Sequence, residues 1–164
     1  MKLIKIISLL FVCLNIPQLF AAESGPFSKS DIEQIRISIT SGEKSLLDMK
    51  IARDGMLGRQ GNGEFPVEPF AVAGQTDSEV FNQLVKVISP KVFAHANTYD
   101  HPDKSGIPIT YSIVFLGEKP KIKVFKFHVG TETKDVGKLL PYFGKFIAHA
   151  VQLTDKWYSE NKSK

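Results

Sequence analysis

Residues 35–60 read IRISITSGEKSLLDMKIARDGMLGRQ, and this stretch decides the fold. Isoleucine alternates with a polar residue over 35–40, and apolar and polar residues alternate again over 47–51. A period of two is typical of a strand with one buried face. Asp54-Gly55 then marks a tight hairpin, because glycine adopts a positive φ at no steric cost. The pattern predicts three consecutive antiparallel strands, the third over 56–60.

The downstream sequence predicts the rest of a two-layer domain. Residues 76–79, TDSE, form a capping box before an apolar run that Pro90 closes, which indicates a helix. Alternation over 109–115 and a return over 121–129 indicate two more strands, and Pro141 fits the first turn of a final helix. The order β-β-β-α-β-β-α has no βαβ alternation. We therefore predict an α+β fold, an antiparallel sheet of about five strands with two helices packed on one face.

Residues 64–75 join the third strand to the first helix. They are rather apolar but contain Pro66 and Pro69. Proline lacks the amide donor that a central strand needs, so the segment is predicted to be an extended connection or an edge strand.

The chain begins with the features of a secretory signal peptide. Lys2 and Lys5 precede and flank an apolar stretch over 6–14, Pro17 interrupts any continuing helix, and small residues at 21–22 offer a cleavage site. An uncleaved anchor, or lipidation of the cysteine inside the apolar stretch, is the alternative. The predicted address is the periplasm or the extracellular space. The predicted organisation is a signal peptide at 1–22, an N-terminal arm at 23–34, a single α+β domain at 35–159 and a frayed tail at 160–164.

Cleavage after Ala22 would change the chemistry of the chain. It would remove Cys13, the only cysteine, so the mature protein would have no disulfide and no cysteine-ligated metal. The formal charge would fall from +4 to +2, because 19 basic residues would face 17 acidic ones. A charge this small gives no reason to expect nucleic acid as a partner. The apolar stretch is also too short for a membrane span, so none is predicted after cleavage.

The segment 95–103 holds the strongest candidate site. His95, Asp100, His101 and Asp103 could bind a metal such as zinc, which accepts imidazole and carboxylate ligands. However, the spacing of the histidines matches no compact ligand motif, and His-Pro-Asp is ordinary turn chemistry. We therefore predict a polar surface loop with binding residues, and no resident metal or cofactor.

Arg59 is a second candidate binding residue. It lies in a glycine-rich stretch, 58–63, that lacks the spacing of a phosphate-binding loop. The glycines fit turns and bulges, and Arg59 is predicted to be an exposed contact point, since arginine is a common interface anchor.

Two other patterns have ordinary explanations beside functional ones. A basic stripe of Lys119, Lys121, Lys123 and Lys126 could meet an acidic protein, or could simply be a solvated sheet face. His128 and His149 could each join a catalytic triad in space, although no G-x-S-x-G elbow is present.

No motif in the chain identifies a reaction. We predict a small exported protein without catalytic activity, which binds another protein of the cell envelope in the manner of an inhibitor or immunity protein. The alternative is a small exported hydrolase that uses the histidines and carboxylates of 95–103, with or without a metal. Convergence of two histidines and a carboxylate across a cleft would favour the hydrolase.

Overall fold

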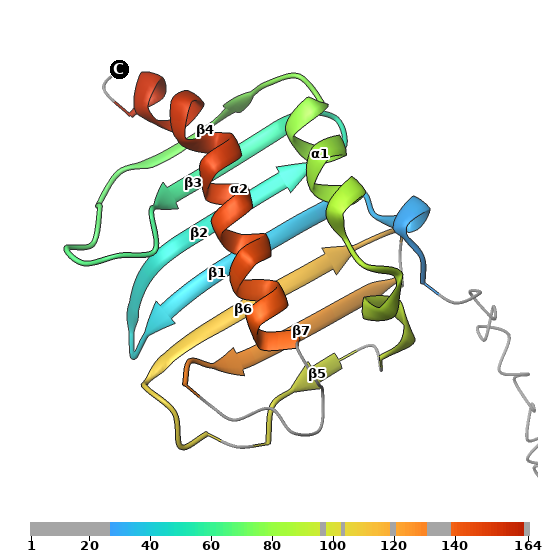
Figure 1. The fold of residues 1–164 in the computed structure, drawn as a ribbon. Coiled ribbons are helices and arrows are strands. Elements are labelled where there is room, and N and C mark those ends of the chain that lie inside the picture. The colour runs from blue at the N-terminus through green and yellow to red at the C-terminus, as the bar shows by residue number, and fades with distance from the viewer. Residues whose placement is uncertain (1–26, 96–97, 103, 119–120, 131–138, 163–164) are drawn as a thin grey trace, which may run out of the picture.

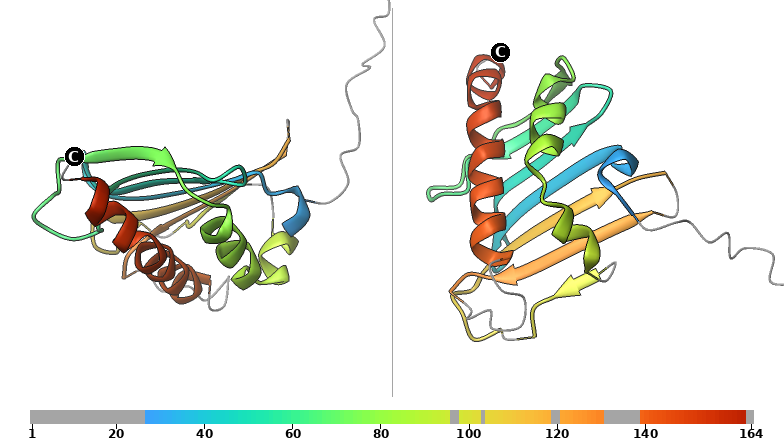
Figure 2. Two further views of the ribbon diagram at one scale, coloured as in Figure 1. Left: turned by 90° about the horizontal axis from the view of Figure 1, so that it is seen from above. Right: turned by 45° about the vertical axis from the view of Figure 1, so that its right-hand side comes forward.

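The computed structural model describes residues 27–95, 98–102, 104–118, 121–130 and 139–162. They form one sheet with the strand order β4-β3-β2-β1-β6-β7-β5, and α1 and α2 cover a single face of it (Figures 1 and 2). The strands are β1 (Gln34–Ser41), β2 (Lys44–Ala52), β3 (Met56–Gly61), β4 (Ala71–Gln75), β5 (Thr98–Asp100), β6 (Ile109–Leu116) and β7 (Ile122–His128). The helices are α1 (Glu79–Val87) and α2 (Leu139–Asn161), with short 3-10 helices η1 (Lys29–Asp31) and η2 (Pro90–Ala94).

The α+β class with two helices on one face is confirmed, but the sheet is larger than predicted and mixed. All neighbouring strands are antiparallel except β5 and β7, which run parallel. The two additional strands are the outermost ones. β5 has only three residues, too few for a period to be recognised, and β4 lies in the proline-containing connection.

The helices differ from their predicted starts. Ser78 is the N-cap of α1, and the Asp77 side chain accepts a hydrogen bond from the Glu79 amide at 3.0 Å, in place of the predicted Thr76 cap. The described part of α2 begins at Leu139, before Pro141, and runs into the segment predicted to fray. Within the described residues, no helix is long and apolar enough to cross a membrane. The predicted signal peptide lies outside them.

Phenylalanine rings fill the space between the sheet and α2. Phe143 of α2 is fully buried. Its ring centroid lies 4.9 Å from that of Phe125, 5.6 Å from Phe127 and 6.5 Å from Phe115, all on β6 and β7. This cluster anchors the first half of α2, because aromatic rings at such distances add to the stability gained by burying their area.

The described part of the predicted N-terminal arm, from Phe27 to the start of β1, packs against the core. Phe27 stacks on Phe93 with centroids 5.8 Å apart, and Ile32 is fully buried. Asp31 accepts hydrogen bonds from Lys121 Nζ and from the Ser28 amide, both at 2.7 Å. These contacts, with the Ser28 hydroxyl, lower the pKa of Asp31 to about 2. The arm is therefore held on the sheet by an ion pair and two rings.

The other face of the sheet carries the alternate residues of each strand and no described helix packs on it (Figure 2). We call it the open face. Its members in the four strands from β1 to β4 include Arg36, Ser38, Asp48, Lys50, Gly58, Gln60, Ala71 and Ala73.

Candidate functional site

The candidate residues of the 95–103 segment do not gather in one place. The ring centroids of His95 and His101 lie 6.4 Å and 6.2 Å from that of Tyr99, on the helix side of the sheet. Asp100 pairs in register with Lys126 on the open face and forms an ion pair with Lys104. Asp103 lies outside the described residues. The two histidines therefore share an aromatic neighbour, while Asp100 is on the opposite face.

His128 and His149 are also on opposite sides of the sheet. His128 pairs with Thr110 at the end of β7, on the open face. His149 is on α2, beside a surface groove that Val87 and Tyr142 also line. Among the described residues, no three histidine, cysteine or carboxylate side chains come together as metal ligands would.

The basic stripe predicted along β7 is not continuous. Lys123 is buried on the helix side, where its ammonium group donates hydrogen bonds to the carbonyls of Phe93 and His95. Burial lowers the pKa of Lys123. Lys121 forms an ion pair with Asp31, so Lys126 is the one exposed lysine of the stripe among the described residues. This strand therefore does not present a continuous row of exposed lysines.

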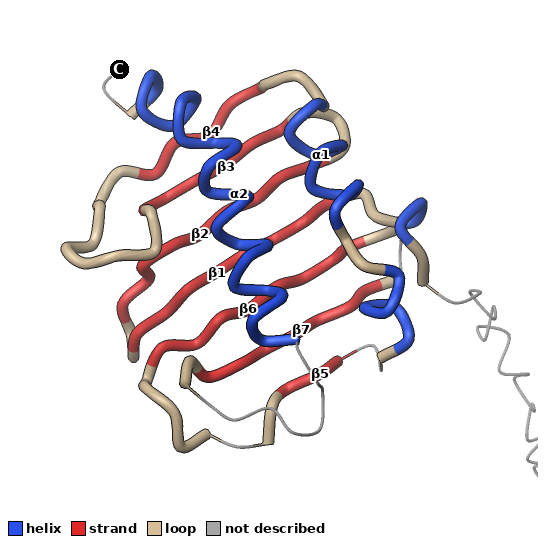
Figure 3. Tube along the Cα trace, in the orientation of Figure 1, coloured by secondary structure: helices blue, strands red, loops and turns tan. Residues whose placement is uncertain are grey.

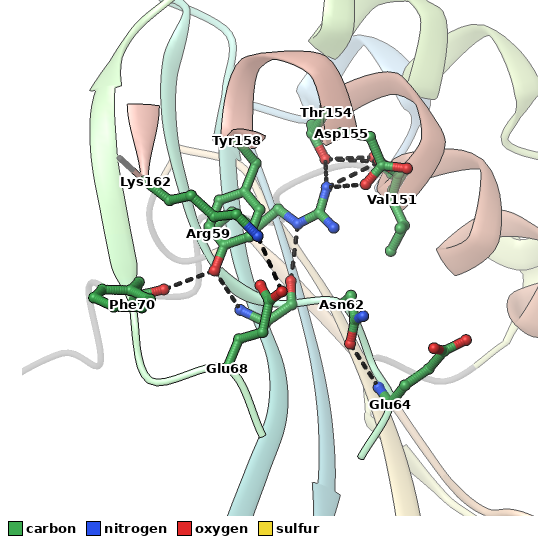
Figure 4. Close-up of polar contacts among 12 residues, drawn as sticks. Arg59, Asn62, Glu64, Glu68, Phe70, Val151, Thr154, Asp155, Tyr158 and Lys162 are labelled. Atoms are coloured by element: carbon green, nitrogen blue, oxygen red, sulfur yellow. Dashed lines mark hydrogen bonds and ion pairs between the residues drawn. The ribbon is translucent and has the colours of Figure 1, made fainter. Parts of the chain in front are cut away.

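Arg59 is buried, and the prediction of an exposed contact is wrong. Its side chain is on the helix side of β3 because alternation places residues 57, 59 and 61 there. Its guanidinium lies 4.6 Å from the Tyr158 ring centroid. The guanidinium donates to the carbonyls of Gly61 (2.9 Å) and Val151 (3.0 Å), to the Thr154 hydroxyl (2.9 Å) and to the Asp155 carboxylate (2.8 Å) (Figure 4). Arg59 thus joins β3 to the second half of α2.

Tyr158 completes this connection at the beginning of β4. Its hydroxyl accepts a hydrogen bond from the Gly61 amide at 3.2 Å and donates one to the Phe70 carbonyl at 2.8 Å, so it bridges two strands at the end of their ladder (Figure 4). Glu68 and Lys162 form an ion pair at 3.0 Å beside it. The hydrogen bond from Lys162 lowers the pKa of Glu68. The chain is therefore firmly held where it enters β4.

The far side of β4 is an open strand edge. β4 is the first strand of the sheet, and β3 is its only neighbour in the described sheet. The Thr76 amide bonds to the Gly55 carbonyl at 2.9 Å, which places residues 72 and 74 in hydrogen-bonded pairs with β3. Because a strand alternates the direction of its amides and carbonyls, those of Ala71, Ala73 and Gln75 point away from β3. No hydrogen bond from these three outward groups to another described backbone segment is present.

This edge lacks the features that usually prevent pairing with another chain. Its five residues, AVAGQ, include no charge, no proline and no register shift. The opposite edge is different, because β5 has only three residues and ends in the Asp100–Lys104 ion pair. Short strands and charges are common protections of sheet edges.

Two exposed aromatic side chains lie next to this edge in sequence. Phe65 and Phe70 are 58% and 59% exposed, more than the other large apolar side chains of the described residues. They belong to the loop that leads from β3 to β4 (Figure 3). Phe70 is held by its carbonyl through Tyr158, while its ring is left in solvent. The β4 edge, by which we mean Ala71–Gln75 together with Phe65 and Phe70, is the candidate functional site.

Neither a search of protein-family models nor a search of curated proteins finds a match to this chain. Its function must therefore be inferred from the chemistry of the β4 edge.

Proposed function

We propose that this protein is a non-catalytic binding protein whose protein partner adds an extended segment to the β4 edge. The proposal retains the prediction of an exported inhibitor or immunity-type protein acting in the cell envelope, with the periplasm or the extracellular space as its address. The observation that carries it is the outward set of amides and carbonyls at residues 71, 73 and 75, on a strand without charge or proline.

Strand addition would satisfy these groups directly. Each hydrogen bond formed in this way contributes about 0.5–1.5 kcal/mol net, so a ladder along a five-residue strand gives affinity without a deep pocket. Phe65 and Phe70 supply exposed apolar area, and aromatic side chains are frequent binding anchors. Arg59 and Tyr158 keep the strand in place, so little order has to be gained on binding.

The hydrolase alternative draws no support from the described part of the 95–103 segment. Asp100 is on the open face, whereas His95 and His101 lie on the helix side beside Tyr99. No specific observation favours a reaction there, so we do not propose one.

Ala73→Pro tests the proposal. The Ala73 amide points away from β3, so proline removes an outward donor and leaves the β3–β4 hydrogen bonds in place. Tagged wild-type protein and the variant would be used to capture proteins from a cell-envelope extract, with mass spectrometry of the bound fraction. We expect a stoichiometric protein on the wild type and at least about a tenfold loss of it on Ala73→Pro, because the ring also blocks the approach of a neighbouring strand.

Ala73→Ser is the matched control, since it keeps the amide and changes only the side chain on the open face. It should capture the same protein at the wild-type level. Circular dichroism melting of both variants checks that the sheet is intact. Equal capture by the folded Ala73→Pro variant would show that the β4 edge is not the binding site.

A further inference from the structure

A hollow lies on the open face immediately beside the β4 edge. Its volume is about 220 Å³, and it crosses from β2 over β3 to β4. Its floor is formed by small residues, Gly58 on β3 with Ala71 and Ala73 on β4, and its rim by Asp48, Lys50 and Gln60 on β2 and β3. A hollow on an otherwise pleated sheet face arises here because three neighbouring positions have almost no side chain.

The fold does not require glycine at position 58. Its φ is not positive, and a Cβ built there would meet its nearest neighbours, Lys50 Cβ and the Val72 carbonyl oxygen, at ordinary distances of 3.8 and 3.9 Å. Glycine inside a strand weakens it, because the unfolded chain loses more conformational freedom on folding. Gly58 therefore has a cost for the sheet, and what it provides is space above the strand.

Lys50 lines this space, and a second cation, Arg36, lies behind it on β1. Arg36 and Lys50 are directly opposite each other on β1 and β2. The Arg53 amide bonds to the Glu33 carbonyl at 2.8 Å, so alternation puts the Arg36–Lys50 pair at a non-hydrogen-bonded position, where side chains are closest. Like charges in such a pair destabilise a sheet. Arg36 Nε donates to Gln34 Oε1 at 2.7 Å, and no ion pair to either cation is present among the described residues.

We propose that the hollow binds carboxylate side chains of an acidic protein segment, and that this segment is the one that pairs with β4. A strand added to β4 would lie three strand spacings from β2, about 14 Å, with only Ala73 and Gly58 between its side chains and Lys50. A glutamate side chain and the Lys50 side chain, both extended over the hollow, can then approach each other, while Arg36, one strand further on, adds to the positive potential. Asp48 at the other end repels glutamate carboxylates, which directs them toward the two cations.

The inference that the partner is acidic rests on the proposed function. The preference of the hollow for carboxylates can be tested without the partner. Hexaglutamate is the probe. It would be added at low salt to ¹⁵N-labelled protein of residues 23–164, and hexalysine is the control of opposite charge. We expect amide shift changes at residues 36, 50, 58 and 73 with hexaglutamate and not with hexalysine. They should fade toward 1 M salt, where charges are screened within about 3 Å.

Gly58→Val and the double variant Arg36→Gln, Lys50→Gln separate shape from charge. Valine fits the strand, so Gly58→Val should melt at or above the wild-type temperature and still lose most of the shift changes. The double variant should bind hexaglutamate at least about fivefold more weakly, and Lys156→Gln on the exposed side of α2 should bind normally. Wild-type binding by Gly58→Val, or shifts centred on the helices, would overturn the proposal. Failure of the proposed function can be distinguished from failure of this inference. In that case Ala73→Pro would still capture the partner protein, while the wild-type protein would still show the shift changes with hexaglutamate.

Discussion

Replacing Arg59 by alanine should lower the free energy of unfolding by about 3–5 kcal/mol, measured by urea denaturation. The side chain is 1% exposed and donates to two backbone carbonyls, of Gly61 and Val151, besides Thr154 and Asp155. Alanine would leave those carbonyls without this donor and a void beneath the Tyr158 ring. The loss should fall mainly on the contact between β3 and the second half of α2.

Asp155→Ala is the control that identifies the source of this effect. The Asp155 side chain is 58% exposed, so its ion pair with Arg59 is largely screened by solvent and its loss should cost no more than about 1 kcal/mol. An Arg59→Ala protein as stable as the wild type would contradict the structural role given to Arg59. A loss in Asp155→Ala as large as in Arg59→Ala would show that the ion pair, and not the buried hydrogen bonds, is what matters.

Phe143→Ala should also lower the free energy of unfolding by about 3–5 kcal/mol, because a buried ring is lost and a cavity remains. Phe143 is fully buried and lies among Phe115, Phe125 and Phe127. The same urea titration would measure it. The m-value should stay close to that of the wild type if the sheet remains folded in the variant's native state.

Phe70→Ala makes the same chemical change on the surface and serves as the matched control. The Phe70 ring is 59% exposed and its carbonyl, which Tyr158 contacts, is kept. Its effect on stability should stay within about 0.5 kcal/mol. Equal losses in the two variants would contradict the packing of α2 on β6 and β7.

Five strands could be predicted from the local sequence. β1, β2 and β6 follow the period of two, the Asp54-Gly55 hairpin leads to β3, and β7 is the return strand beside β6. β5 could not be found in this way, because three residues do not define a period. Its parallel pairing with β7 depends on the whole fold, not on its own sequence.

Arg59 and Lys123 show why two buried charged residues were predicted to be at the surface. Alternation along β3 and β7 puts both on the buried side, yet their charge argued for solvent. Each is tolerated there because carbonyls far away in sequence accept its hydrogen bonds, Val151 for Arg59 and Phe93 for Lys123. A strict application of the period would have found them, whereas their partners could be known only from the folded chain.

The β4 edge was partly visible in the sequence. Pro66 and Pro69 indicated an edge strand or a connection, and residues 71–75, AVAGQ, contain no charged side chain. What the sequence could not show is the direction of the amides. That direction follows from the pairing of Thr76 with Gly55.

Amide hydrogen exchange, measured residue by residue by NMR with and without the captured partner, tests the open β4 edge most directly. In the free protein the outward amides of Ala71, Ala73 and Gln75 should exchange at least about tenfold faster than those of Val72 and Gly74, which face β3. Adding the partner should slow the three outward amides and leave the two inward ones nearly unchanged. Outward amides that are already protected in the free protein, or that stay unprotected in the complex, would contradict strand addition at β4.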